Sequence, residues 1–224
     1  MPLALLDLND TIIGSYRRDG FVLDDQDFFP LDGAMDALRL WRDEGWKVAV
    51  VTNQSGHHRF PDRVTEEQMV TLMDHIKGGL WAQTGQDVPF YVCYHDGQDC
   101  DHCGGKGFTM CADSFDQETY KCMTCGGFGS VGCDCRKPRP GLIKQALLDH
   151  ECDPTDAVMI GDKWSDIMAG DLASVPGILI GTFGYENRGR SQMPKDVPDP
   201  RLWVPDLWQA AVVTVARHRM GSPL

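Results

Sequence analysis

Four short polar segments of this chain carry the residue types that chemistry on a phosphate ester requires. They read Asp7-Leu-Asn-Asp-Thr-Ile12, Thr52-Asn-Gln-Ser-Gly56, Cys135-Arg-Lys-Pro-Arg-Pro-Gly141 and Gly161-Asp-Lys-Trp-Ser-Asp166. Together they supply carboxylates, a hydroxyl, an amide and a lysine. Phosphoryl transfer needs a nucleophile, a cation and donors for the equatorial oxygens, and this set offers all three. One such segment alone is more typical of a turn. The presence of all four, in this order along the chain, is what indicates phosphoryl transfer.

Apolar strands that alternate with helix-like stretches are expected to position these segments. The expected strands are Leu3–Asp7, Lys47–Thr52, Pro89–Cys93, Ala157–Ile160 and Gly177–Gly181. The expected helices are Met35–Arg42, a helix from the capping box Thr65–Gln68 through Leu80, Pro140–Asp149 and Leu207–Arg217. Such alternation predicts an α/β fold with a parallel sheet, right-handed crossovers and a site beyond the carboxyl ends of the strands.

The cysteines form a second chemical pattern. The chain has 9, and all but Cys152 lie between Cys93 and Cys135. Short spacings of this kind favour metal binding over disulfides. Two C-x-x-C-x-G-x-G segments, which resemble the DnaJ-type zinc repeat, supply four thiolates for a predicted zinc site: Cys100, Cys103, Cys122 and Cys125. His102 is an alternative ligand in the same segment.

The four polar segments resemble the signature of the haloacid dehalogenase (HAD) superfamily. The resemblance covers roughly residues 3–185, and it is strongest to the branch of histidinol-phosphate and heptose-bisphosphate phosphatases, which carries Thr-Asn-Gln-Ser-Gly, Cys-x-Cys-Arg-Lys-Pro-x-Pro-Gly and Gly-Asp-Lys. It implies a Rossmann-like three-layer α/β sandwich with a parallel sheet. We expect residues 1–92 and 136–224 to form this core, and residues 93–135 to form a cysteine-rich, zinc-binding insert.

The resemblance also implies a role for each matching residue. Asp7 would be the catalytic nucleophile that forms an aspartyl-phosphate. Mg²⁺ would be held by Asp7, Asp162 and the backbone carbonyl of Asn9, with support from Asp166. Substrate would be bound by Thr52, Asn53, Arg136 and Lys137. Lys163 would be either part of the site or a surface lysine that balances its charge.

Asn9 departs from the family pattern, which has an aspartate two residues after the nucleophile. That aspartate protonates the leaving group and later activates water, and an amide does neither. Three explanations are open: the substrate has a good leaving group, Asp10 takes over the role, or the chain is a weak or inactive relative. The hypotheses are therefore a Mg²⁺-dependent phosphatase of a small metabolite, a polynucleotide 3′-phosphatase, and a catalytically impaired, zinc-organised binding protein.

A further zinc site is implied by the heptose-phosphatase branch, which has a similar Cys-x-His and Cys-x-Cys loop. Its ligands here would be Cys93, His95, Cys133 and Cys135. The net charge of −12 disfavours nucleic acid as a partner without excluding it. No apolar run approaches the roughly 20 residues that span a bilayer, and the start of the chain lacks the basic region of a signal peptide, so we expect a cytoplasmic protein.

Overall fold

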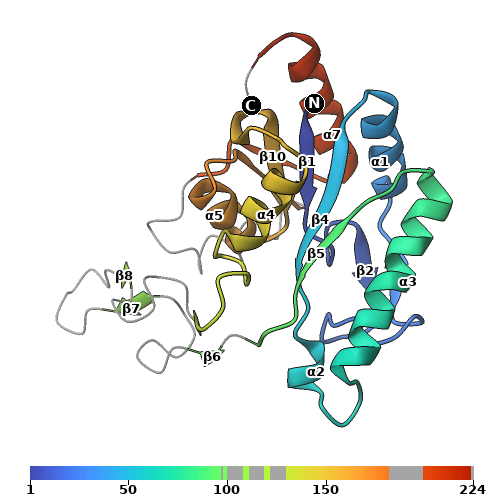
Figure 1. Cartoon of the computed structure of the whole chain (residues 1–224), viewed down its shortest axis with the longest axis vertical. Coiled ribbons are helices and arrows are strands. Elements are labelled where there is room, and N and C mark those ends of the chain that lie inside the picture. Colours follow the sequence, from blue (N-terminus) through green and yellow to red (C-terminus); the bar gives the residue numbers. More distant parts are fainter. Residues whose placement is uncertain (97, 100–107, 111–118, 122–129, 182–198, 223–224) are drawn as a thin grey trace.

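A six-stranded parallel sheet forms the centre of the computed structural model (Figure 1), with strand order β12-β11-β10-β1-β4-β5. The structure describes residues 1–96, 98–99, 108–110, 119–121, 130–181 and 199–222. The strands of the sheet are β1 (Leu3–Leu6), β4 (Lys47–Asn53), β5 (Phe90–Cys93), β10 (Ala157–Gly161), β11 (Gly177–Ile180) and β12 (Leu202–Val204). The predicted α/β class is thereby confirmed, with β1 between β10 and β4.

Alternation along β1 explains why both faces of the sheet are covered. Leu3 and Leu5 belong to one buried cluster, whereas Ala4 and Leu6 belong to the other. Successive side chains of a strand point to opposite faces, so an unbroken apolar strand needs a partner layer on each side.

Five helices provide these two layers. One cluster joins the sheet to α1 (Ala34–Asp43), α3 (Glu66–Thr84) and α7 (Leu207–Arg219). The other joins it to α4 (Gly141–Asp149) and α5 (Trp164–Leu172). The fold is therefore the predicted three-layer sandwich. Among the described residues, no helix has the length and apolar content needed to cross a membrane.

The capping box at the start of α3 is formed as predicted. The backbone N–H of Gln68 donates to Thr65 Oγ1 at 3.2 Å, and the backbone N–H of Thr65 donates to Gln68 Oε1 at 2.8 Å. The helix continues past the predicted end at Leu80 and reaches Thr84. Gly85 follows with φ 66°, a left-handed conformation that favours glycine and ends the helix.

Several elements have no counterpart in the sequence prediction. A hairpin of β2 (Ile13–Ser15) and β3 (Phe28–Pro30) follows the Asp7 segment, and the short helix α2 (Gly56–Arg59) follows Thr52. A 3-10 turn spans Pro154–Asp156. Within 93–135, β6 (Gln98–Asp99) pairs with β9 (Ser130–Val131), and β7 (Phe108–Met110) pairs with β8 (Thr119–Lys121). Figure 1 shows β6, β7 and β8 apart from the central sheet.

Candidate active site and metal centre

Three carboxylates meet at the carboxyl ends of the central strands. Asp7 follows β1, Asp162 follows β10, and Asp166 lies in the first turn of α5. One oxygen from each lies within 4.8 Å of the others. They meet because parallel strands bring consecutive loops to one edge of the sheet. Asp7 and Asp166 are buried, and the side chain of Asp162 is 4% exposed.

Lys137 joins two of these carboxylates. Its Nζ lies 2.8 Å from Asp7 Oδ1 and 2.7 Å from Asp166 Oδ1, and it also donates to the carbonyl oxygen of Val51 at 2.7 Å. The lysine side chain is 2% exposed. Such a buried ammonium fixes the position of Asp7 and supplies positive charge where an anionic substrate would arrive.

Gly161 makes room for this arrangement. A Cβ atom at this position would lie 2.3 Å from Asp166 Oδ2. The same Asp166 oxygen accepts a hydrogen bond from the backbone N–H of Lys163 at 3.0 Å. Any side chain at Gly161 would therefore push Asp166 away from Lys137.

The charge balance of the site is negative. Among the residues that the structure describes, the carboxylates of Asp7, Asp10, Asp162 and Asp166 are paired with Lys137 and Lys163, and these six groups carry a net charge of −2 when all are ionised. Lys163 Nζ lies 3.2 Å from Asp162 Oδ2 and 3.8 Å from Asp10 Oδ2, so its charge belongs to the site.

The pKa values follow from this imbalance. Burial opposes ionisation of Asp7, but Lys137 and Lys163 outweigh it and hold the Asp7 pKa below its ordinary value. Burial, aided by Asp7 and Asp166, raises the pKa of Asp162 to about 7 despite Lys163. Asp162 Oδ2 is also buried, and the contact given for it among the described residues is the ion pair with Lys163 at 3.2 Å. A divalent cation between these carboxylates fits both observations, and oxygen donors of this kind suit Mg²⁺.

Gln54 organises the two polar loops on either side of Asp7. Its Nε2 donates to Asn9 Oδ1 at 2.7 Å and to Thr52 Oγ1 at 3.0 Å. The predicted residues Asn9 and Thr52 are therefore brought together, although no role was assigned to Gln54. The signal was its position within Thr-Asn-Gln, two residues after Thr52.

Asn53 holds the backbone of the lysine loop. Its Nδ2 donates to the carbonyl oxygen of Lys137 at 3.1 Å, and its Oδ1 accepts from the Lys137 N–H at 3.0 Å. Asn53 was predicted to bind substrate. In the structure both of its side-chain polar atoms hold Lys137 in register with β4.

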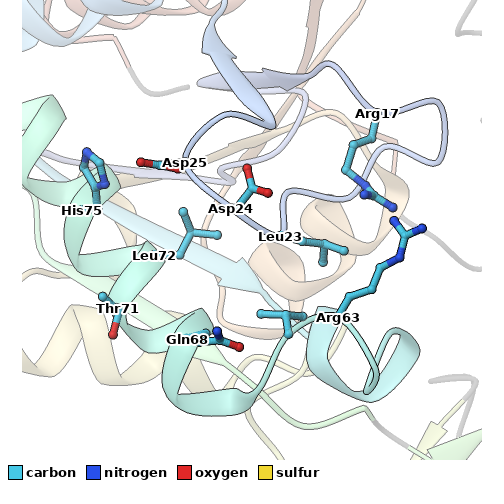
Figure 2. Close-up of a pocket in the computed structure, with 10 residues that line it drawn as sticks. Arg17, Leu23, Asp24, Asp25, Arg63, Gln68, Thr71, Leu72 and His75 are labelled. Atoms are coloured by element: carbon cyan, nitrogen blue, oxygen red, sulfur yellow. The ribbon is translucent and has the colours of Figure 1, made fainter.

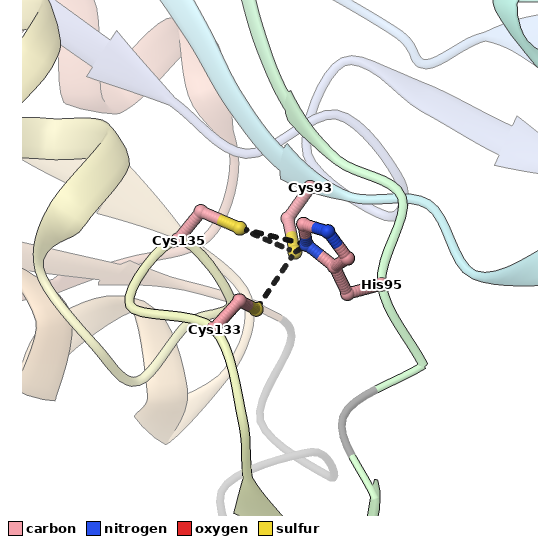
Figure 3. A group of neighbouring side chains, drawn as sticks. All are labelled: Cys93, His95, Cys133 and Cys135. Atoms are coloured by element: carbon pink, nitrogen blue, oxygen red, sulfur yellow. Dashed lines mark hydrogen bonds between the residues drawn. The ribbon is translucent and has the colours of Figure 1, made fainter.

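A separate cluster of sulfur and nitrogen atoms lies at the end of β5 (Figure 3). The Sγ of Cys93 lies 3.7 Å from that of Cys133 and 3.6 Å from His95 Nδ1. Cys135 Sγ lies 3.0 Å from Cys93 Sγ and 3.1 Å from His95 Nδ1. Zinc with bonds of about 2.3 Å to sulfur in a tetrahedron separates its ligands by about 3.7 Å, so this predicted set fits a closed zinc site.

The loop after this cluster leads directly to Lys137. Arg136 donates to the carbonyl oxygen of His95 at 2.9 Å, and Arg139 donates to that of Cys133 at 2.9 Å. Gly141 then approaches Asp134 so closely that a Cβ would lie 2.4 Å from its carbonyl oxygen. The cluster and Lys137 therefore belong to one tightly bonded loop.

The predicted Cys₄ site falls outside the described residues. Cys100, Cys103, Cys122 and Cys125, together with His102, belong to segments whose structure is not described. This site stays a prediction from sequence.

His57 is a half-buried histidine that follows the Thr52 segment. It lies in α2, and its side chain is only 9% exposed. Its ring packs against His58, with centroids 4.0 Å apart, and neither ring nitrogen has a hydrogen-bond partner among the described residues. Burial and the neighbouring His58 lower the His57 pKa.

A cavity of about 710 Å³ lies away from the carboxylates, between α3 and the loop from β2 to β3. Figure 2 shows Arg17 and Arg63 extending toward one another at one end of it. Arg17 is already paired with Asp19 at 2.6 Å. None of the carboxylates or lysines of the site lines this cavity.

Comparison with known proteins agrees with this geometry. A family model described as HAD-hydrolase-like matches residues 134–210. The D-glycero-beta-D-manno-heptose-1,7-bisphosphate 7-phosphatase of Haemophilus influenzae is 34% identical over 73% of this chain and 74% of its own. That of Pseudomonas putida is 26% identical over 92% of this chain and 95% of its own.

Solved structures show the same fold. D,D-heptose 1.7-bisphosphate phosphatase from B. bronchiseptica, complexed with magnesium and phosphate, superposes with a TM-score of 0.69 at 22% identity, covering 97% of this chain and 99% of the other. A putative HAD-like phosphatase from Mesorhizobium loti gives 0.63 at 20% identity, covering 96% and 86%.

Fold and site together define a HAD-like hydrolase that acts on phosphoric monoesters. Within that class, the chain belongs to the family of the heptose-1,7-bisphosphate 7-phosphatases.

Proposed function

We propose that the chain is a Mg²⁺-dependent phosphatase of a small phosphorylated sugar, with Asp7 as the nucleophile. The observation that carries the proposal is the contact of Lys137 with Asp7 and Asp166, beside a third carboxylate, Asp162, within 4.8 Å. The sugar is proposed because the relatives are named for a heptose bisphosphate.

The residues then have these roles. The ionised Asp7 attacks phosphorus, the bond to the leaving oxygen breaks, and an aspartyl-phosphate forms; water next attacks phosphorus and releases phosphate, which regenerates Asp7. Lys137 and the Thr52 hydroxyl hold the phosphoryl oxygens, and Arg136 contacts the rest of the substrate. Asp7, Asp162 and the carbonyl of Asn9 would hold Mg²⁺, with Asp166 in support; Mg²⁺ would supply charge neutralisation of the phosphoryl oxygens.

With Asn9 in place of an acid, the rate of the reaction depends on the leaving group of the substrate. Its Oδ1 accepts from Gln54, and its amide has no proton that it can give to an alkoxide. In this proposal the leaving oxygen takes its proton from water, which slows cleavage of alkyl esters relative to aryl esters.

Two zinc sites belong to the same proposal. Cys93, His95, Cys133 and Cys135 would form one that fixes the Lys137 loop, and Cys100, Cys103, Cys122 and Cys125 would form the other within the insert 93–135. The described cluster at Cys93 supports the first, and the paired C-x-x-C spacing supports the second.

The test is turnover of p-nitrophenyl phosphate, with and without Mg²⁺, followed by a panel of sugar phosphates and 3′-phosphorylated oligonucleotides. We expect Mg²⁺-dependent release of phosphate that Asp7→Asn reduces to background. A matched control, Asp36→Asn, changes an aspartate that is 65% exposed and paired with Arg39, and it should leave activity unchanged. Undiminished turnover by Asp7→Asn would contradict the proposal.

A further inference from the structure

The cavity of about 710 Å³ between α3 and the loop from β2 to β3 has no part in the proposed reaction. We call it the arginine groove, because Arg17 and Arg63 line one end of it. Its volume falls in the range of small-molecule sites, about 300–1,000 Å³. Three buried side chains, Leu23, Val64 and Leu72, give the lining an apolar part against which carbon atoms of a ligand can pack.

Arg17 is a donor that the protein already holds in place. Its Nε and Nη2 donate to the two carboxylate oxygens of Asp19, at 3.0 and 2.6 Å, and its guanidinium carbon lies 5.4 Å from the centroid of the Phe60 ring. A second carboxylate, Asp27, lies 3.9 Å from Nε. Among the described residues, Nη1 of Arg17 has no hydrogen-bond partner. A ligand that accepts from Nη1 would therefore meet a guanidinium that is preorganised.

Arg63 brings a second guanidinium group to the same end of the groove. Figure 2 shows its side chain extending toward that of Arg17. Its backbone is fixed, because its N–H donates to the carbonyl oxygen of Phe60 at 3.0 Å. Its side chain is exposed and makes no hydrogen bond or ion pair within the part of the chain that the structure describes. Two converging guanidinium groups with free N–H donors suit an anion, and phosphate matches their planar fork best.

The other end of the groove offers hydrogen-bond acceptors. Figure 2 shows Asp25 and His75 at the end opposite the two arginines, and Asp24 also belongs to the lining. Asp24 Oδ1 accepts from the backbone N–H of Gln26 at 2.9 Å, whereas the Asp25 carboxylate has no partner among the described residues. Carboxylate oxygens accept from hydroxyl groups. A ligand with a phosphate at one end and hydroxyl groups at the other would find partners along the whole groove.

We propose that the arginine groove binds a phosphorylated polyol, either a sugar phosphate or a nucleotide, at a site separate from the catalytic carboxylates. The phosphate would lie between Arg17 and Arg63, the hydroxyl groups would face Asp25, and the carbon skeleton would pack on Leu23 and Leu72. The proposal is independent of the phosphatase function, because none of the proposed catalytic residues lines the groove.

Calorimetric titration of the full chain in Mg²⁺-free buffer tests the proposal. The probes are glucose 6-phosphate, AMP and inorganic phosphate, and turnover of the proposed phosphatase does not occur without Mg²⁺. We expect saturable binding of glucose 6-phosphate or AMP, and the tighter of the two identifies the source of the phosphate. Inorganic phosphate should bind more weakly, because it leaves the acceptor end of the groove empty.

Two arginine variants then locate the ligand. Arg63→Gln should weaken binding by about tenfold or more, since a charge-assisted hydrogen bond is lost. Arg18→Gln is the matched control, because Arg18 is an exposed arginine of the same loop that does not line the groove, and the affinity should not change. Circular dichroism and hydrolysis of p-nitrophenyl phosphate with Mg²⁺ should match wild type in both variants.

Three results would overturn the inference: no saturable binding of glucose 6-phosphate or AMP, unchanged affinity in Arg63→Gln, or an equal loss in Arg18→Gln. Unchanged affinity in Arg63→Gln would place the ligand elsewhere, including at the catalytic carboxylates. A wild-type chain that does not hydrolyse p-nitrophenyl phosphate would count against the phosphatase alone, since the titration does not depend on turnover.

Discussion

At the scale of single residues, the site is defined by which carboxylates are compensated and which are not. Asp7 and Asp166 share the buried ammonium of Lys137, whereas Asp162 is paired with the partly exposed Lys163. The difference appears in the pKa values. Burial raises the Asp7 pKa, but Lys137 and Lys163 outweigh it and lower the pKa, whereas burial, with Asp7 and Asp166, raises the Asp162 pKa to about 7. Asp7 is therefore ready as an anionic nucleophile, and Asp162 is where a cation gains most.

The first prediction concerns Asn9. Replacement Asn9→Asp restores a group that can give and take a proton, and its carboxylate can accept the same hydrogen bond from Gln54. We expect kcat for alkyl phosphates to rise by about 10²-fold, with a much smaller rise for p-nitrophenyl phosphate, whose leaving group needs no acid. Steady-state kinetics on both ester types measures this. An equal change for both would show that Asn9 acts in another way.

The second prediction concerns the pH dependence of Mg²⁺ binding. Without a cation, the native protein binds the Asp162 proton up to pH about 7, whereas an ordinary carboxyl loses it near 3.8, so stability falls as pH rises through this window. Mg²⁺ binds only the ionised form. Its affinity should therefore decrease about tenfold per pH unit below 7. Calorimetric titration of Mg²⁺ into the Mg²⁺-free protein, repeated from pH 5 to 8, measures this affinity. A Mg²⁺ affinity that does not change with pH would contradict the prediction.

At the scale of elements, one loop joins the sulfur cluster to the catalytic lysine. Cys133 and Cys135 precede Lys137, and side chains of Arg136 and Arg139 fasten the loop to backbone carbonyls near the cluster. Asn53, at the end of β4, then holds the Lys137 backbone from the other side. The position of the Lys137 ammonium beside Asp7 thus depends on the loop that contains Cys133 and Cys135. This loop has few apolar side chains, and zinc would stabilise it in place of a hydrophobic core.

The third prediction follows from this loop. Cys135→Ser should remove one of two zinc equivalents per chain and lower kcat about 10- to 100-fold, because Lys137 loses its fixed position. Cys152→Ser is the matched control, since Cys152 lies near the carbonyl of Met1 rather than in the cluster. Metal content by mass spectrometry and kcat are measured on the same samples. Full activity in zinc-depleted protein would contradict the prediction, because it would show that catalysis does not need zinc at this cluster.

At the scale of the whole molecule, the main hydrophobic core and the catalytic carboxylates occupy different parts of the fold. The larger buried cluster is built by α1, α3 and α7 on one face of the sheet, whereas the carboxylates lie at its carboxyl edge. A buried hydrogen bond from Trp41 Nε1 to Thr214 Oγ1, at 3.0 Å, joins α1 to α7 within this layer.

The fourth prediction tests this separation. Thr214→Val keeps the shape of the side chain but leaves the Trp41 N–H buried without its acceptor, which should lower the free energy of unfolding by about 1–3 kcal/mol. Activity of the folded protein should not change. Thr71→Val, the same substitution at an exposed position of α3, should cost little. Urea denaturation and kcat are compared, and a stability loss equal to that of Thr71→Val would count against the buried bond.

The strands beside the candidate site could be predicted from the sequence because their apolar runs are long enough to recognise. β1, β4 and β10 lie where predicted; Asp7 follows β1, Thr52 lies at the end of β4, and Asp162 follows β10. The hairpin of β2 and β3 was missed because each strand has three residues, too few for a period. α5 was missed because Ile167, Met168, Ala169 and Gly170 are all buried, so no polar face marks the helix. Gln54 was missed because its role depends on two loops far apart in sequence.

Trapping the phosphoenzyme is the sharpest experiment on the role of Asp7. Wild-type protein with Mg²⁺ is mixed with a radiolabelled phosphate ester, quenched in acid, digested and analysed by peptide mass spectrometry. We expect one phosphoryl group per chain, carried by Asp7 and absent from Asp7→Asn. Turnover with no label on Asp7, or with label on another residue, would contradict it.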